Sequence, residues 1–498
     1  MNHFSSSCYT TLTTGVSTTS RLSMERRSPF GPFSNQSMTA SYLITEASTA
    51  APHTSAQNAG GTGYLANVAT VLGGQFACAL FALAIEICYA RLIGPAGRGQ
   101  ISLCMIVIGI GVVMASLGGE TPIAVWGANR KNRIADWLPA VYFWGFLGST
   151  AVDSLWALVY WRWHPSSLHG ITGSLAMLVL LAVPATIFLD YILAFLSGME
   201  LFRQRAGLIL ASQIMKFVAT IVLVLAVGRT AEMAIAGNLM GLACAAILGV
   251  ILMKQGTRSP WSINAAQQNL WPALSLGVRG QFGTLATLVS YRLDVFVVNY
   301  FLGPAQVGLY ALGVVISESL WQVPNAAALA LLPRTARTLD QKSTEFTCAV
   351  LRQVCLIACL LGLLLALSAP FLIPWIFGSR FAPSVQVIWW ILPGTLALSL
   401  SKVMSADITA RGKPEFNSYV AIMGGIATVV LDFAFIPRMG IQGAALASSI
   451  AYLLEGIVLG FVLRRQLGIS WRSMLLPSGG EFAAYSGLWQ ALRSRLGS

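Results

Sequence analysis

The chain has 498 residues, of which 56% are hydrophobic and only 10% are charged, and its mean hydropathy is +0.70. A soluble domain carries roughly 25% charged residues, so this composition excludes a large soluble core and indicates a protein of the lipid bilayer. The net charge of +13 does not predict a nucleic-acid partner, because the basic residues fall mostly in short loops between apolar stretches.

Residues 1–60 are rich in Ser, Thr, Ala and Asn and contain no long apolar run. Such a segment cannot bury enough surface to offset its ordering entropy, so we predict a disordered tail. Apolar stretches long enough to cross a bilayer, about 20 residues each, begin after Gly61. These predicted membrane helices cover residues 64–90, 99–120, 138–160, 174–197, 206–227, 231–253, 274–302, 307–332, 347–368, 384–406, 416–436 and 441–463.

This spacing predicts six helices, a polar break and six helices again. The expected organisation is an N-terminal lobe over 61–253, an interfacial linker on the cytoplasmic side over 254–273 and a C-terminal lobe over 274–463. A cytoplasmic tail over 464–498 would follow, with an amphipathic helix near its end.

Lys and Arg concentrate in alternate loops, which predicts that both termini lie in the cytoplasm. The loops assigned to the opposite side carry fewer basic residues, namely Arg91, Arg98, Arg162, Arg229, Arg380 and Arg438. The eight cysteines include no C-x-x-C pair, so neither a disulfide framework nor a metal site is expected, and no cofactor is predicted.

Two short motifs recur, one copy in each predicted lobe. Gly94-Pro95-Ala96-x-x-Gly99 matches Gly303-Pro304-Ala305-x-x-Gly308 at an offset of 209 residues. Upstream of each, Gly74-Gln75-Phe76 matches Gly280-Gln281-Phe282 at an offset of 206 residues. Pro and Gly suit a tight turn between helices, so the sequence predicts a parallel internal repeat.

These motifs, together with the segments 411–414 (RGKP) and 440–447 (GIQGAALA), give the chain a family resemblance over about residues 62–465. The sequence resembles the oligosaccharide flippase branch of the multidrug/oligosaccharidyl-lipid/polysaccharide exporter superfamily. The resemblance implies an all-α polytopic membrane protein with about 12 transmembrane helices in two six-helix lobes that form a V-shaped cavity. It also implies alternating access, a polyprenyl-pyrophosphate-linked oligosaccharide as cargo, and a place in the cell inner membrane beside membrane lipid and polysaccharide polymerases.

Charged residues inside the predicted helices are the candidate site, because a charge at bilayer depth costs about 2.5–3.5 kcal/mol on insertion scales. In the fold that the resemblance implies, the first two helices of each lobe face the cavity. We expect cations to contact the pyrophosphate, with Arg292 as the main group and Arg279 or Lys216 in support. The candidate coupling carboxylates are Glu86, Glu318 and Asp294. For each charge the alternative is a structural ion pair between helices, or a side chain that reaches the interface.

Three other functions remain open from the residues. A cation-coupled multidrug extruder of the same fold would favour an acidic, aromatic cavity. A polysaccharide polymerase or ligase would need a long extramembrane loop or a dense polar site, whereas the four histidines all lie outside the predicted helices. No Walker A motif is present, so ATP is not the expected energy source, and no enzyme activity is predicted. A structural scaffold would leave the charges in both lobes without a role.

Overall fold

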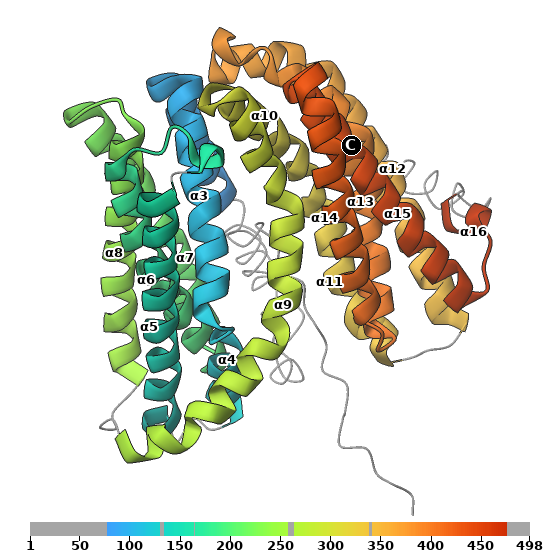
Figure 1. The fold of residues 1–498 in the computed structure, drawn as a ribbon. Helices are drawn as coiled ribbons and strands as arrows, with labels where there is room; N and C mark the ends of the chain where they lie inside the picture. Colours follow the sequence, from blue (N-terminus) through green and yellow to red (C-terminus); the bar gives the residue numbers. More distant parts are fainter. Residues whose placement is uncertain (1–76, 130–133, 164, 257–262, 338–340, 476–498) are drawn as a thin grey trace, which may run out of the picture. The chain divides into compact units, whose positions relative to one another are not determined.

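The computed structural model describes residues 77–129, 134–163, 165–256, 263–337 and 341–475, all of which belong to one compact unit of the chain. These residues form helices and short turns, with no strand among them (Figure 1). The predicted tail over 1–60 and most of the predicted C-terminal tail lie outside the described residues.

The first half begins with a helix over residues 77–88, and its remaining elements follow in chain order. They are η2 (Tyr89–Ile93), α3 (Gly94–Ser116), α4 (Glu120–Asn129), α5 (Ile134–Leu158), η4 (Val159–Trp163), η5 (Ser166–Leu168), α6 (Gly173–Gly198), α7 (Phe202–Ala226) and α8 (Ala231–Gly256).

The second half is likewise built from helices. Its elements are α9 (Ile263–Leu302), α10 (Pro304–Glu318), η6 (Ser319–Trp321), α11 (Gln322–Arg337), α12 (Gln341–Phe377), η7 (Ser379–Phe381), α13 (Ser384–Ala410), α14 (Glu415–Met439), α15 (Ile441–Leu467) and α16 (Trp471–Leu475).

Nine helical runs within the described residues are long and apolar enough to cross a membrane. The first of these runs, Ala77–Ser116, contains two of the predicted spans because η2 joins the first helix to α3. The predicted spans over 138–160 and 307–332 correspond to α5 and to α10 with α11. The chain is therefore an all-α, multi-pass membrane protein, as the sequence predicted.

The helix α9 is longer than expected and changes direction along its length (Figure 1). The sequence placed the start of this span at residue 274, after a linker, but the helix begins at Ile263. Its first part packs on α5, where the indole Nε1 of Trp144 donates to the carbonyl of Leu270 at 2.7 Å. Part of the expected linker is thus helix held against the first half of the chain.

The predicted helix over 307–332 is interrupted by the 3-10 turn η6. Pro324 lies in the first turn of α11, and a proline removes the backbone N–H that would bond to the carbonyl four residues earlier. That carbonyl belongs to Leu320, inside η6. The break leaves Glu318 as the last residue of α10.

The two copies of the repeated motif pack directly on each other where α3 crosses α10. A Cβ atom on Gly99 would lie 1.7 Å from the carbonyl oxygen of Pro304, and one on Gly308 would lie 2.0 Å from that of Pro95. Glycine at both positions lets the two backbones touch. The turn before each helix is a single glycine with positive φ, 86° at Gly94 and 80° at Gly303.

Side chains add to this contact at the same end of the helices. The amide nitrogen of Asn299 in α9 donates to the carbonyl oxygens of Ser167 and His169, at 2.8 and 3.0 Å. The Nε of Arg91 in η2 donates to the carbonyl of Ile376, in the last turn of α12, at 2.7 Å. The two halves of the chain therefore contact each other at the end where α3 and α10 begin.

We expect Gly99→Ala to weaken the crossing of α3 and α10, because the added methyl group meets backbone that cannot rotate away. Overpacking of this kind costs about 1–3 kcal/mol, so the thermal unfolding midpoint in detergent should fall by several degrees. Gly109→Ala in the same helix is the matched control, since a Cβ there meets no heavy atom within 4 Å. Equal unfolding midpoints for the two variants would show that close packing of α3 on α10 does not contribute to stability.

Candidate functional site

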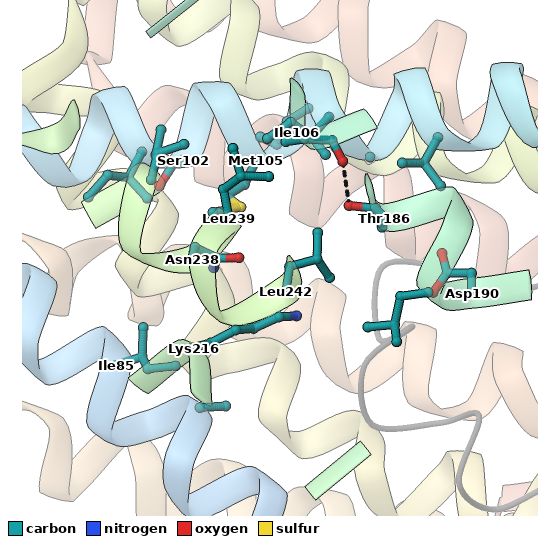
Figure 2. A pocket seen from close by; sticks show the side chains of 18 of the residues that line it. Ile85, Ser102, Met105, Ile106, Thr186, Asp190, Lys216, Asn238, Leu239 and Leu242 are labelled. Carbon is teal, nitrogen blue, oxygen red and sulfur yellow. Dashed lines mark hydrogen bonds between the residues drawn. The ribbon is translucent and has the colours of Figure 1, made fainter. Parts of the chain in front are cut away.

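A cavity of about 450 Å³ lies among the helix over 77–88, η2, α3, α6, α7 and α8, with α9 and α10 forming one side (Figure 2). Most of its wall is apolar. The charged residues that line it are Glu86, Arg98, Glu120, Asp190, Lys216 and Arg292. Three of the six predicted site residues are therefore in the wall, from both halves of the chain.

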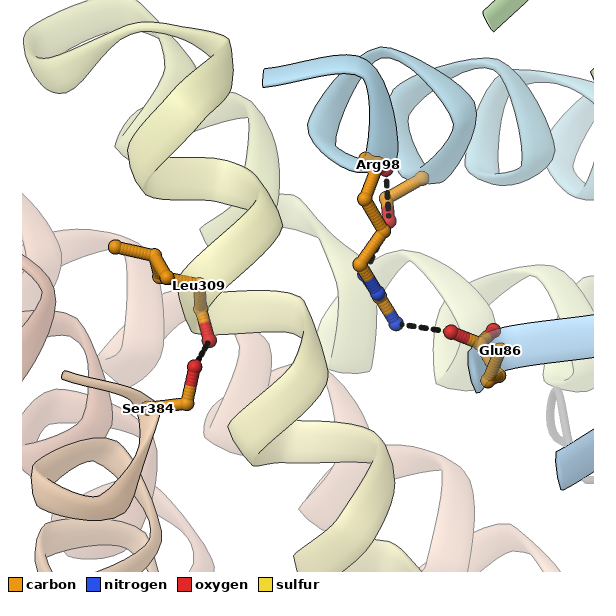
Figure 3. A network of polar contacts seen from close by, with 5 residues as sticks. Glu86, Arg98, Leu309 and Ser384 are labelled. Carbon is orange, nitrogen blue, oxygen red and sulfur yellow. Dashed lines mark hydrogen bonds and ion pairs between the residues drawn. The ribbon is translucent and has the colours of Figure 1, made fainter. Parts of the chain in front are cut away.

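Glu86 lines the cavity in an ion pair with Arg98 (Figure 3). The Nη2 of Arg98 lies 2.7 Å from the Oε2 of Glu86, and its Nη1 donates to the hydroxyl of Ser102 at 2.7 Å. The assignment of Arg98 to an outer loop was wrong. Because the turn before α3 is only one residue long, Arg98 falls in the first turns of that helix, where it is 2% exposed.

Arg292 is also in an ion pair. Its Nη2 lies 2.7 Å from the Oε2 of Glu318, and the two side chains are 14% and 13% exposed. Arg292 lines the cavity, whereas Glu318, at the end of α10, is not part of the cavity wall. The Oε1 of Glu318 is buried and has no hydrogen-bond partner among the described residues. Any anion that reaches Arg292 therefore competes with a carboxylate already bound there.

Glu86 and Arg292 both lie on the helix that precedes the repeated Gly-Pro-Ala motif, one in each half. In the first half the anion is on this helix and its cation is on the next helix. In the second half the two charges are reversed. Opposite charges from the two halves therefore line one cavity.

Asp294 points away from the cavity. Two residues along an α-helix correspond to about 200° of rotation, so Asp294 and Arg292 lie on opposite sides of α9. The carboxylate of Asp294 accepts hydrogen bonds from the hydroxyl of Tyr310 at 2.5 Å and from the N–H of Val295 at 2.7 Å. The hydroxyl of Ser448, in α15, is 3.5 Å away. Asp294 is therefore part of the packed interior of the second half.

Lys216, in the middle of α7, is 8% exposed and points its amine into the cavity (Figure 2). It makes no hydrogen bond or ion pair with any residue that the structure describes, although Asp190 is close enough to interact with it electrostatically. The side chain of Arg279, the third cation expected to contact substrate, lies outside the described residues.

The sequence-based selection missed three charged residues of the wall, Arg98, Glu120 and Asp190. Glu120 was not selected because it is the last residue of the predicted span over 99–120. Arg98 was missed because it was counted as a loop residue. Asp190 lies within the predicted span 174–197 and in α6, so the rule for charges at bilayer depth would have found it.

A second lysine within the helices, partly buried, lies outside this cavity and is useful for comparison. The amine of Lys402 in α13 lies 4.6 Å from the centre of the Trp321 ring, a cation–π contact. Its electrostatic neighbours are Glu318 and Glu455. Lys402 therefore has an aromatic contact and two carboxylate neighbours, whereas Lys216 has one carboxylate neighbour, Asp190.

Comparison with known proteins gives a family and a fold. A family described as "Polysaccharide biosynthesis protein" matches residues 88–386. A relative from Shigella flexneri named "Putative O-antigen transporter" is 22% identical over 198 residues, covering 38% of this chain and 47% of its own length. An uncharacterized membrane protein of Methanocaldococcus jannaschii is 22% identical over 265 residues, covering 49% of this chain and 62% of its own. The chain thus spans less than two thirds of either relative.

Solved structures agree on the fold. The lipid II flippase MurJ, in an inward closed conformation, superimposes with a TM-score of 0.64 at 15% identity, over 78% of this chain and 86% of that one. A multidrug resistance MATE family transporter of the MOP superfamily, inward-facing, gives 0.63 at 13% identity, over 78% and 94%. Both the family and the fold agree with the resemblance found in the sequence motifs.

We expect Arg292 and Glu318 to be strongly coupled in stability. Removing one partner of a buried ion pair leaves an uncompensated charge and costs about 3–5 kcal/mol, whereas removing both costs far less. Arg292→Gln and Glu318→Gln should each lower the thermal unfolding midpoint, and the double variant should recover most of the loss. If the losses add in the double variant, the ion pair at 2.7 Å does not couple the two residues energetically.

Proposed function

We propose that this chain, which belongs to the polysaccharide biosynthesis protein family, flips a lipid-linked oligosaccharide or polysaccharide precursor across the bacterial cytoplasmic membrane. The observation that carries the proposal is the cavity among helices long and apolar enough to cross a membrane, whose wall contains the cations Arg98, Lys216 and Arg292. Ionised groups are costly there, and a polar cargo that must pass between the two halves accounts for them.

The proposed mechanism is alternating access by rocking of the first half against the second. The glycosylated head would occupy the polar cavity while the lipid tail remains in the bilayer. In this mechanism the contact between Gly99 and Gly308 closes one end of the pathway and must separate for release at that end. Both termini would lie in the cytoplasm.

In this proposal the pyrophosphate is bound by the cations of the wall, Arg292 and Lys216, with Arg279 in support. Charge-assisted hydrogen bonds from guanidinium and ammonium groups replace the water that hydrates the phosphates. Arg292 would bind the anion by exchanging its contact with Glu318, 2.7 Å away, for a phosphate oxygen.

Glu86, Glu318 and Asp294 are the proposed coupling carboxylates, and their surroundings differ. Glu86 and Glu318 each accept from an arginine, so they are held as ion pairs. The hydrogen bonds to Asp294 come from a tyrosine hydroxyl and a backbone N–H. A carboxylate bound by such neutral donors gains or loses a cation more readily than one held by arginine, so we place coupling first at Asp294.

One observation favours a second candidate, a cation-coupled extruder of organic cations. The same wall contains the carboxylates Glu86, Glu120 and Asp190, so its lining charges balance. The two candidates differ in what accumulates when the protein is lost.

Deletion of the gene should cause a finished lipid-linked oligosaccharide to accumulate on the cytoplasmic leaflet, measured by extraction and mass spectrometry of lipid-linked sugars. Surface polysaccharide should fall in parallel, and wild-type protein should restore it. Protein carrying Arg292→Ala at the wild-type level should restore export poorly. Sensitivity to cationic drugs without any accumulated lipid-linked sugar would favour the extruder, and loss of a product without a finished precursor would favour an enzyme.

If Asp294 couples transport to an ion gradient, Asp294→Asn should remove the dependence of flipping on that gradient in proteoliposomes. The amide is nearly isosteric, and its single oxygen can keep the hydrogen bond from Tyr310 while the one from the N–H of Val295 is lost, so the fold should persist. Asp153→Asn, in α5 and outside the cavity wall, is the control. A variant at residue 294 that responds to a proton or sodium gradient as the wild type does would exclude Asp294 from coupling.

A further inference from the structure

The starting point is the energetic state of Lys216. It is more than nine-tenths buried and faces the cavity, and it donates no hydrogen bond within the described part of the chain. A largely buried ammonium without a bonded partner is costly, because no hydrogen bond from the protein replaces the hydration that burial removes. A residue in this state is stabilised when an anion binds to it.

The packing of α7 on α8 fixes the position from which Lys216 projects. Gly237 and Gly241 form a G-x-x-x-G pattern on α8 that lets the two helices approach closely. A Cβ on Gly241 would lie 2.4 Å from the backbone of Lys216, and one on Gly237 would lie 2.5 Å from that of Thr220. The backbone at Lys216 cannot shift, so the amine is directed into the cavity by rigid elements.

The other described cations of the wall are already compensated. Arg98 is held by Glu86 and Arg292 by Glu318, both at 2.7 Å. An anion that enters the cavity therefore meets Lys216 without having to displace a carboxylate that is bonded to it.

We propose that Lys216, with the side-chain amide of Asn238 beside it, forms the primary phosphate-binding subsite, and that Arg292 engages only after it leaves Glu318. This inference rests on the proposed function and names the group of the cargo that binds first. Asn238 lies within the G-x-x-x-G segment and lines the same space (Figure 2). An ammonium has three donors and an amide has two more, which suits the several oxygens of a diphosphate.

Asp190 lies across the cavity from Lys216 and would determine how the bound cargo is oriented (Figure 2). Its carboxylate interacts electrostatically with Lys216, and a bound phosphate replaces that interaction, while carboxylate oxygens accept hydrogen bonds from sugar hydroxyls. The hydroxyl of Thr186, also in the wall, lies on the same helix. The diphosphate thus binds at α7 and α8, and the first sugar lies toward α6.

The test is binding of geranylgeranyl diphosphate to the full-length protein in detergent. We expect Lys216→Gln to bind about tenfold more weakly or worse, as loss of a charge-assisted hydrogen bond predicts, and Lys216→Arg to retain binding. Lys402→Gln removes a partly buried lysine outside the cavity and should bind as the wild type does. Competition by inorganic pyrophosphate would support recognition of the phosphates alone. Binding that pyrophosphate does not displace would support a subsite that also needs the prenyl chain.

A second measurement uses the wild-type protein and so does not depend on the folding of a variant. Lys216 should react with a membrane-permeable amine reagent, and saturating geranylgeranyl diphosphate should protect it, as read by peptide mass spectrometry. Equal affinities of Lys216→Gln and wild type, or unprotected labelling at saturation, would overturn the subsite while leaving the flippase proposal intact. A wild type that binds no diphosphate and flips no lipid-linked sugar would refute the proposed function itself.

Discussion

An ionised side chain within the bilayer must have a partner, and this requirement organises the interior of the protein. Arg98 and Arg292 satisfy it with carboxylates from a neighbouring helix in their own half of the chain. Asp294 satisfies it with hydroxyl and amide donors inside the second half. Lys216 has no bonded partner among the described residues, so a ligand can reach it without displacing a bonded carboxylate.

The internal repeat explains how such charges come to share one cavity. Glycines at equivalent positions let α3 and α10 touch through their backbones, which brings the first helices of the two halves to the same wall. Glu86 and Arg292, from the first helix of each half, line that wall with opposite charge. Two like charges there would repel each other, whereas these two are each held by a partner on the next helix.

The sequence predicted the membrane helices well, because they depend on local composition. Hydropathy gave the spans, and the motif ending in Gly99 and Gly308 marked the crossing. The bonded partners of the charges were not predictable, since Glu86 with Arg98 depends on how two helices meet. Arg98 was placed in a loop because hydropathy, averaged over many residues, does not detect a turn of one glycine. The availability of Lys216 is likewise a property of packing.

Close packing also bears on how the cavity can change shape. The contact of α7 with α8 places glycine directly against backbone, so these helices cannot slide without a clash, and Lys216 must move with them as one body. The side chain of Arg292 is held by the contact of its guanidinium group with Glu318. Its helix, α9, bends and packs on both α5 and α14. Motion between the halves therefore changes the distance from Arg292 to Lys216 more than it changes the surroundings of Lys216 itself. A rigid first contact and a movable second one allow an anion to bind before the halves rearrange, which is the order that alternating access requires.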